Sequence, residues 1–161
     1  MLDFIGQNKI ASNWLLEYPE RRQDFMARLS EFSFLSATIY TGMPTGTDVG
    51  TPCENKALSL ALMEESRLWI MTIEDTERVI GEKKLAFLDA RRWVDKQQRK
   101  STPEKGRPGW ISATQARYAD WFFCRFNQTS YPDSKTVTKW WDEIVNITVR
   151  IAIARGCVFK K

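Results

Sequence analysis

Histidine is absent from the 161-residue sequence, and this absence narrows the chemistry that the chain can perform. Histidine is the commonest general base and metal ligand in proteins, and it activates the nucleophile in Ser-His and Cys-His pairs. Carboxylates and lysines remain available for catalysis. We therefore expect a binding protein and not an enzyme, with no bound metal and no cofactor.

Cysteine is also scarce, and long apolar runs are lacking. Cys53, Cys124 and Cys157 are far apart and share no Cys-x-x-Cys spacing, which argues against both a disulfide framework and a zinc site. Without a run of 18 apolar residues we expect no membrane-spanning helix. Residues 1–5 do not resemble a signal peptide, so we expect a reducing, cytoplasmic location.

Charges of the two signs are unevenly distributed, although the net charge is only +4. Residues 1–98 contain 12 Lys and Arg against 15 Asp and Glu, a net charge of −3. Residues 99–161 contain 12 against 5, a net charge of +7. Such a division is typical of a polyanion-binding region joined to a region with another role.

Apolar residues recur every three or four positions in the first 32 residues, a spacing that indicates helices. Pro19 interrupts this pattern, because proline lacks the N–H that a helix interior needs but fits the first position of a new helix. We therefore expect two short helices, over about 7–17 and 20–32, that meet at Tyr18 and Pro19.

A long helix is predicted in the middle of the chain. Residues 34–51 are rich in glycine and proline and are typical of a loop. Residues 51–54, Thr-Pro-Cys-Glu, then form a capping box. Apolar periodicity continues to about residue 98, but Gly81 costs about 1 kcal/mol relative to alanine. The segment is therefore either one bent helix or a helical hairpin.

The last third begins with a linker-like segment, residues 99–111, which contains two prolines, two glycines and four basic residues. Residues 112–115, Ser-Ala-Thr-Gln, form a second capping box and predict the start of an aromatic helix. Asp133 or Ser134 is expected to cap a final helix, and Gly156 is placed to end it.

These elements predict an all-α fold, because few segments alternate apolar and polar residues. It would contain an N-terminal helical hairpin, a long helix that is either straight or kinked, and a C-terminal helix-turn-helix-like unit. We expect three regions: an acidic helical region for dimerisation or partner contact (1–98), a basic linker (99–111) and a basic DNA-binding region (112–161).

The start of the last helix is the main candidate for a functional site. In a helix-turn-helix protein, short polar and basic residues at the start of the recognition helix reach base edges, while later residues pack inward. The candidates for base-edge contacts are Lys135, Thr136, Thr138 and Lys139. The candidates for phosphate contacts are Arg99, Lys100, Lys105, Arg107, Arg117, Arg125 and Ser134. The alternative is an ordinary amphipathic helix with a solvated charged face.

Two other patterns have residue types that could support chemistry. Glu64 and Glu65, with Lys83 and Lys84 nearby, could hold Mg²⁺ in a metal-dependent nuclease. A solvent-exposed helix face with i,i+3 and i,i+4 ion pairs explains them better. The glycine-rich segment 42–50 lacks the Gly-Lys-Ser/Thr of a phosphate-binding loop, so we interpret it as a plain loop.

A family resemblance lies in the layout. Leu15-Leu16-Glu17-Tyr18-Pro19 would end a first helix, residues 20–32 follow as a second, and 43–57 combine a Pro/Gly loop with a capped helix start. This order resembles the RinA/ArpU type of late-gene transcriptional activators from phages of Gram-positive bacteria. The resemblance implies a C-terminal helix-turn-helix similar to region 4 of sigma factors, DNA binding, and action in the cytoplasm of a bacterial host cell.

One departure from that family concerns the C-terminus. A helix of about ten residues usually precedes the recognition helix there, and residues 127–133 leave no room for it. Either 112–127 takes that supporting role, or the C-terminus is not a true helix-turn-helix.

We therefore expect a sequence-specific DNA-binding transcriptional regulator, of the phage or prophage late-gene activator kind. Its expected partners are double-stranded DNA, RNA polymerase and a second copy of itself. The alternative is a helical adaptor or inhibitor that binds a host protein such as RNA polymerase.

Overall fold

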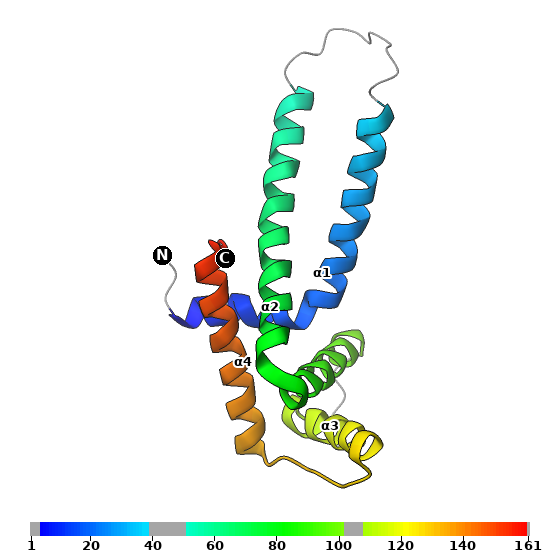
Figure 1. Cartoon of the computed structure of the whole chain (residues 1–161), viewed down its shortest axis with the longest axis vertical. Helices are drawn as coiled ribbons and strands as arrows, with labels where there is room; N and C mark the ends of the chain where they lie inside the picture. The colour runs from blue at the N-terminus through cyan, green and yellow to red at the C-terminus, as the bar shows by residue number, and fades with distance from the viewer. Residues whose placement is uncertain (1–3, 39–50, 102–107, 161) are drawn as a thin grey trace.

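The computed structural model describes residues 4–38, 51–101 and 108–160, and for 33–38 and 51–56 it describes the backbone alone (Figure 1). The described part of the chain contains helices and no strand, which confirms the predicted all-α fold. The four helices are α1 (Phe4–Thr38), α2 (Thr51–Lys100), α3 (Trp110–Phe126) and α4 (Ser134–Arg155). In the same part of the chain, every helix is too short or too polar to cross a bilayer.

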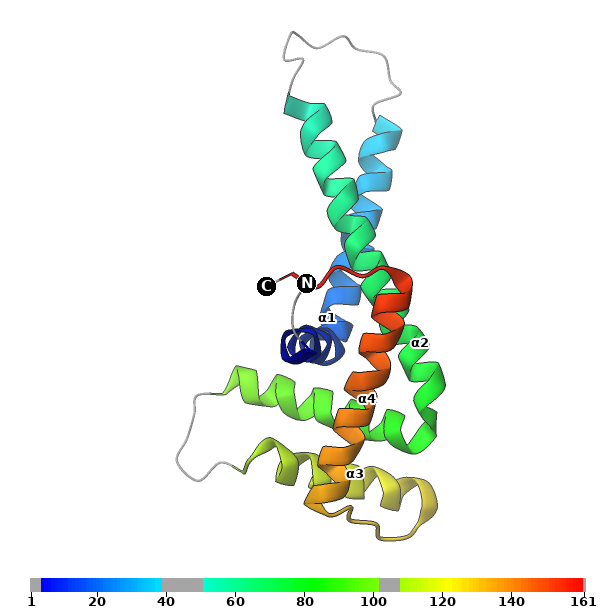
Figure 2. The same cartoon turned by 90° about the vertical axis from the view of Figure 1, so that its left-hand side faces the viewer.

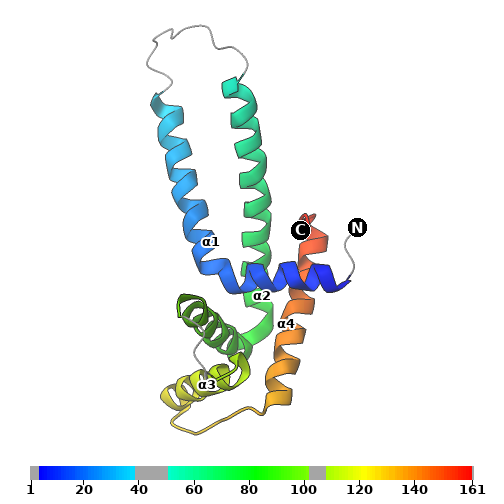
Figure 3. The same cartoon turned by 180° about the vertical axis from the view of Figure 1, so that it is seen from behind.

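Helix α1 continues through Pro19 instead of ending there, so the expected pair of short helices is a single element. Its first part crosses the body of the protein, and its later part turns sharply to run beside α2 (Figures 1 and 3). Proline removes one backbone hydrogen bond and crowds the preceding turn, which bends a helix without necessarily ending it. Helix α1 also extends to Thr38, so residues 34–38 of the expected loop are helical.

Helix α2 changes direction at Gly81, whose φ of 78° and ψ of 166° are not helical. A side chain is excluded from this backbone region, which is why the corner falls on glycine. The part of α2 after the corner packs beside α3 (Figure 2). The corner settles the question left open by the sequence: α2 is kinked into two helical parts.

The second capping box was a wrong prediction. Helix α3 begins at Trp110 with Gly109 as its N-cap, two residues before Ser112. The ring of Trp110 lies 6.4 Å from that of Trp141, and the guanidinium of Arg91 lies 4.4 Å from the Trp110 centroid. Packing of this indole between α2 and α4 explains why the helix starts earlier than the sequence signal.

Both predicted caps of α4 are confirmed. The Asp133 side chain accepts a 2.7 Å hydrogen bond from the backbone N–H of Thr136. At the other end, Gly156 has a left-handed φ of 75° and donates its N–H to the carbonyls of Ala152 and Ile153. The ends of α4 are therefore fixed by local chemistry that is visible in the sequence.

One hydrophobic core contains residues from all four helices. Leu15 of α1, Trp69 and Phe87 of α2, Tyr118 of α3 and Ile144 of α4 are all almost fully buried. The later part of α4 packs against α2 before the corner, and its start packs against α2 after the corner and against α3 (Figures 1 and 2). The core thus joins residues from both sides of segment 99–111; the division of roles between regions stays a prediction.

Some predictions lie outside the described residues. They concern the loop over 39–50, the side chains of the Thr51 capping box, Cys53, and two of the phosphate-contact candidates, Lys105 and Arg107.

Candidate nucleic-acid interface

The first two turns of α4 expose one polar face. Val137 and Ile144 are fully buried on the inner side of the helix, which fixes its rotation. Because an α-helix has 3.6 residues per turn, Lys135, Thr138 and Lys139 then point away from the core. Three of the four base-edge candidates are therefore exposed together, as the sequence predicts.

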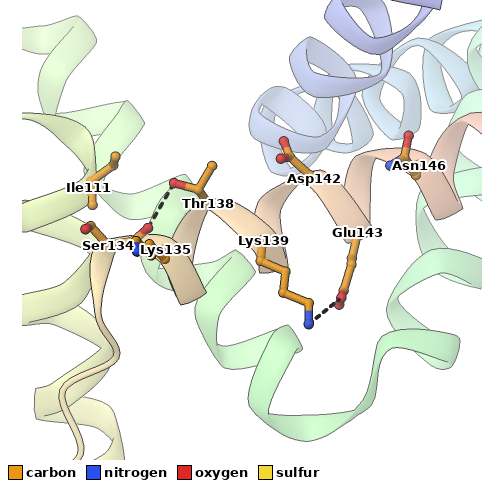
Figure 4. Close-up of a pocket in the computed structure, with 8 residues that line it drawn as sticks. All are labelled: Ile111, Ser134, Lys135, Thr138, Lys139, Asp142, Glu143 and Asn146. Carbon is orange, nitrogen blue, oxygen red and sulfur yellow. Dashed lines mark hydrogen bonds and ion pairs between the residues drawn. The ribbon is translucent and has the colours of Figure 1, made fainter.

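An open groove of about 710 Å³ follows this face (Figure 4). Ile111, at the start of α3, lines it from the other side, so the groove begins where α3 and α4 cross. The residues of α4 that line it are Ser134, Lys135, Thr138, Lys139, Asp142, Glu143 and Asn146. Of the described phosphate-contact candidates, Ser134 alone belongs to this groove.

The charge of the groove changes along α4. The ammonium of Lys139 lies 4.0 Å from the Glu143 carboxylate, and 74% of its side chain is exposed. Glu143 forms a shorter ion pair of 2.6 Å with Lys84 of α2, and this contact holds the pKa of Glu143 below its usual range. Asp142 is exposed nearby. The first two turns are thus basic and the next two acidic, which favours anion contact at the start of α4.

Thr136 differs from its three neighbours. Its backbone N–H is held by the Asp133 cap, its side chain is half-buried, and it is not part of the groove lining. Hydrogen bonds from Thr136 hold the pKa of the Asp133 carboxyl below its usual range. Asp133 therefore keeps its negative charge near Lys135 at neutral pH. Thr136 stabilises the start of α4 through the cap and contributes little to the exposed face.

Thr138 offers acceptor groups to a ligand. Its hydroxyl donates a 2.9 Å hydrogen bond to the carbonyl of Ser134, the residue one turn earlier (Figure 4). The remaining lone pairs of the hydroxyl point outward as acceptors. With Lys135 and Lys139, this face therefore offers two ammonium donors and one hydroxyl acceptor.

Of the remaining phosphate candidates that the structure describes, none lines the groove at the start of α4. Arg99 forms a 2.6 Å ion pair with Asp95, and Arg125 forms one of 3.2 Å with Glu82. Lys100 is exposed at the end of α2. Arg117 lines a second groove, between α2 and α3. Pairing with carboxylates within the fold makes Arg99 and Arg125 weaker phosphate ligands than their sequence positions suggest.

The second groove, of about 420 Å³, lies between the later part of α2 and α3. The guanidinium of Arg117 sits 4.6 Å from the centroid of the Trp93 ring, and Trp93 is 46% exposed. Trp121 and the exposed Cys124 also line it. Arginine and tryptophan are enriched at protein-binding surfaces. Sequence reasoning missed this groove because it depends on the corner at Gly81, which turns Trp93 toward α3.

Two adjacent arginines, which the sequence alone would place on a basic surface, are buried. Arg91 and Arg92 are each at least 91% buried. Arg91 lies between Trp110 and Trp141, and burial lowers the pKa of its guanidinium. Their position between the buried residues Leu88 and Val94 was the available sequence signal.

The carboxylates of the nuclease alternative are engaged in ion pairs. Glu64 accepts two hydrogen bonds from Arg67, of 2.7 and 2.8 Å, and Glu65 pairs with Lys160 at 3.1 Å. Among the residues that the structure describes, no three carboxylates or thiols come together as a metal site would require. Glu64 therefore pairs within α2, whereas Glu65 links α2 to the C-terminal segment.

Comparison with known protein families, with curated proteins and with solved structures gives no match for this chain. The resemblance to phage late-gene activators therefore stays a prediction.

Proposed function

We propose that this protein binds double-stranded DNA through the first two turns of α4 and acts as a transcriptional regulator. The observation that supports this most is the joint exposure of Lys135, Thr138 and Lys139 at the start of a helix whose rotation is fixed by buried Val137. A recognition helix presents its N-terminal residues to the major groove in this way. The finer assignment, activation of phage or prophage late genes, depends on the layout resemblance alone.

The placement of α3 also favours the proposal. It lies across the start of α4, and the two are joined by residues 127–133 (Figure 1). In helix-turn-helix proteins the first helix crosses the DNA backbone in a comparable position. Helix α3 would thus take the supporting role that another helix has in the phage activators. The proposed partners are duplex DNA, RNA polymerase and, through the surface argued below, a second copy of the chain.

A selection experiment tests sequence-specific binding. The full chain is incubated with a random duplex library, and the retained DNA is amplified and sequenced. We expect a shared motif, and we expect its enrichment to disappear in the Lys135→Ala/Lys139→Ala variant. The matched control is Lys9→Ala/Lys160→Ala, which removes the same charge from exposed positions elsewhere. A library that shows no motif with the unmodified chain contradicts the proposal.

The groove that contains Trp93 and Arg117 favours a second function, binding of a host protein such as RNA polymerase. An exposed indole stacked under a guanidinium is a typical anchor for a protein partner. Purified RNA polymerase and the nuclease-treated chain should then associate, and Trp93→Ala should weaken that association. Equal binding by Trp93→Ala and the unmodified chain excludes this groove as the contact.

A further inference from the structure

Two helical segments project from the body of the protein. The part of α1 after residue 23 and the part of α2 before residue 64 run side by side beyond α3 and α4 (Figures 1 and 3). We call these two segments the arm. The C-terminal segment packs on α2 only as far as the base of the arm, where Phe159 contacts Trp69 and Lys160 pairs with Glu65. Beyond that point α2 faces α1 on one side.

The α2 part of the arm exposes leucine side chains on more than one face. Residues 57–63 read Ala-Leu-Ser-Leu-Ala-Leu-Met and contain no charged residue. Leu58 is 62% exposed, Leu60 46% and Leu62 50%. A helix that is apolar all round is normally buried, because each exposed face leaves hydrocarbon in water. A single neighbouring helix cannot cover these leucines, which point in several directions.

The α1 part of the arm adds to this surface and leaves a groove. Met26 is 50% exposed, while Phe25, Leu62 and Met63 line a groove of about 190 Å³ between the two helices. Leu58 and Leu62 lie one helical turn apart on the same face of α2, and Leu62 lines this groove, so apolar side chains of both helices are exposed along it. The arm therefore has the form of half a four-helix bundle.

Two charged residues on the rim of this groove indicate which kind of partner would bind to the arm. Asp24 and Arg28 are exposed, line the groove and, within the described part of the chain, take part in no ion pair. They carry opposite charges one helical turn apart. In a dimer with twofold symmetry, Asp24 of one copy can pair with Arg28 of the other copy. The symmetry repeats this contact, so two such ion pairs form. The uncharged stretch 57–63 adds no repulsion between identical copies.

We propose that the arm is a dimerisation surface, and that its occupant is the arm of a second copy of this chain, packed about a twofold axis as a four-helix bundle. The contact would lie near the lower end of specific interfaces, about 1,000 Å² in total. A reversible, concentration-dependent dimer is therefore expected. The proposal does not depend on DNA binding, although a dimer would present two copies of α4.

Analytical ultracentrifugation of the full chain, treated with nuclease and measured over a wide concentration range, tests the proposal. We expect a monomer–dimer equilibrium. The Leu58→Glu/Leu62→Glu variant should be monomeric, because dimerisation would bury its carboxylates and bring those of the two copies close together. Val79→Glu, at a 65% exposed position of α2 outside the arm, should dimerise like the unmodified chain. Circular dichroism checks the fold, and Met26→Lys replaces the double variant should that variant not fold.

A charge exchange separates self-association from other partners. Asp24→Arg alone should raise the dimer dissociation constant roughly three- to tenfold, since two rim pairs become repulsive. Asp24→Arg/Arg28→Asp should restore it, because the reciprocal pairs form again with reversed signs. A monomer at every concentration, an unchanged dimer in Leu58→Glu/Leu62→Glu, or no recovery in the exchanged variant overturns the proposal. The proposal is also overturned if the chain is monomeric and binds a different protein through the arm.

Discussion

The Nε of Arg92 donates a 2.8 Å hydrogen bond to the carbonyl oxygen of Leu15. Leu15 lies four residues before Pro19, so its carbonyl is the one that proline, lacking an N–H, leaves without a helical partner. The same guanidinium forms a 2.6 Å ion pair with Glu77 and lies 5.0 Å from the Tyr18 ring centroid. One side chain of α2 thus completes the bend of α1 and fixes both helices where the core begins.

Replacement of Arg92 should therefore be strongly destabilising. Arg92→Ala leaves the buried Leu15 carbonyl unpaired and Glu77 without its cation, and we expect a loss of about 3–5 kcal/mol in the free energy of unfolding. Arg92→Lys should lose less than Arg92→Ala because it keeps a cation for Glu77, but it should still lose stability because an ammonium cannot donate in both directions from a planar fork. Urea unfolding measures the change. Arg78→Ala is the matched control, because its ion pair with Asp75 involves a 76% exposed side chain; a loss in Arg92→Ala no larger than in this control contradicts the assignment.

Gly81 should tolerate no side chain, for a reason that concerns only the backbone. Its φ of 78° and ψ of 166° lie in a region restricted to glycine, while a Cβ atom there would meet nothing within 4 Å. Gly81→Ala should cost about 1–3 kcal/mol of stability without any steric clash. Gly156→Asn is the comparison, because its left-handed φ of 75° is one that asparagine accepts. Thermal unfolding that ranks the two variants in the opposite order would exclude this explanation.

Alkaline pH should weaken the fold through Tyr18. Burial, together with the nearby carboxylates of Glu74 and Glu77, raises the pKa of the Tyr18 hydroxyl to about 12. The unfolded chain loses this proton near pH 10, whereas the folded protein still holds it. The stabilising contribution is therefore complete below pH 10 and lost as the pH rises toward 12. Tyr18→Phe should lose stability less steeply between these values, measured by urea unfolding at each pH; equal slopes contradict the prediction.

The cysteines should differ in reactivity. Cys124 is exposed, whereas Cys157 is buried with its sulfur 3.3 Å from the hydroxyl of Thr72. Burial raises the pKa of the Cys157 thiol, which reduces the thiolate fraction further. In a Cys53→Ser background, a thiol reagent should modify Cys124 rapidly and Cys157 only after denaturant is added. Mass spectrometry assigns the sites, and equal rates in the native protein would show that the C-terminal segment is not packed as described.

Local sequence signals predicted the features that depend on a few neighbouring residues. The caps at Asp133 and Gly156 and the interruption at Gly81 are of this kind, because each is decided by one side chain or by its absence. The exposed face of Lys135 and Lys139 followed from helical periodicity.

Features that depend on distant residues could not be predicted. Helix α1 bends at Pro19 without ending because Arg92, 77 positions after Leu15, supplies the missing donor. Helix α3 starts at Trp110 because that ring packs against Trp141. The ion pair of Arg125 with Glu82, which weakens Arg125 as a phosphate ligand, also forms only because α3 packs beside α2. The pair of Arg99 with Asp95 is different, because its i,i+4 spacing within one helix is visible in the sequence.

The central claim is that the start of α4 contacts duplex DNA, and the salt dependence of binding tests it most directly. The logarithm of the binding constant for the full chain should fall linearly with the logarithm of salt concentration. In Lys135→Ala/Lys139→Ala the slope should become shallower, by about one for each lysine that loses a phosphate contact. Lys9→Ala/Lys160→Ala should keep the original slope. Absence of binding at low salt, or the same slope in all three proteins, would contradict the account.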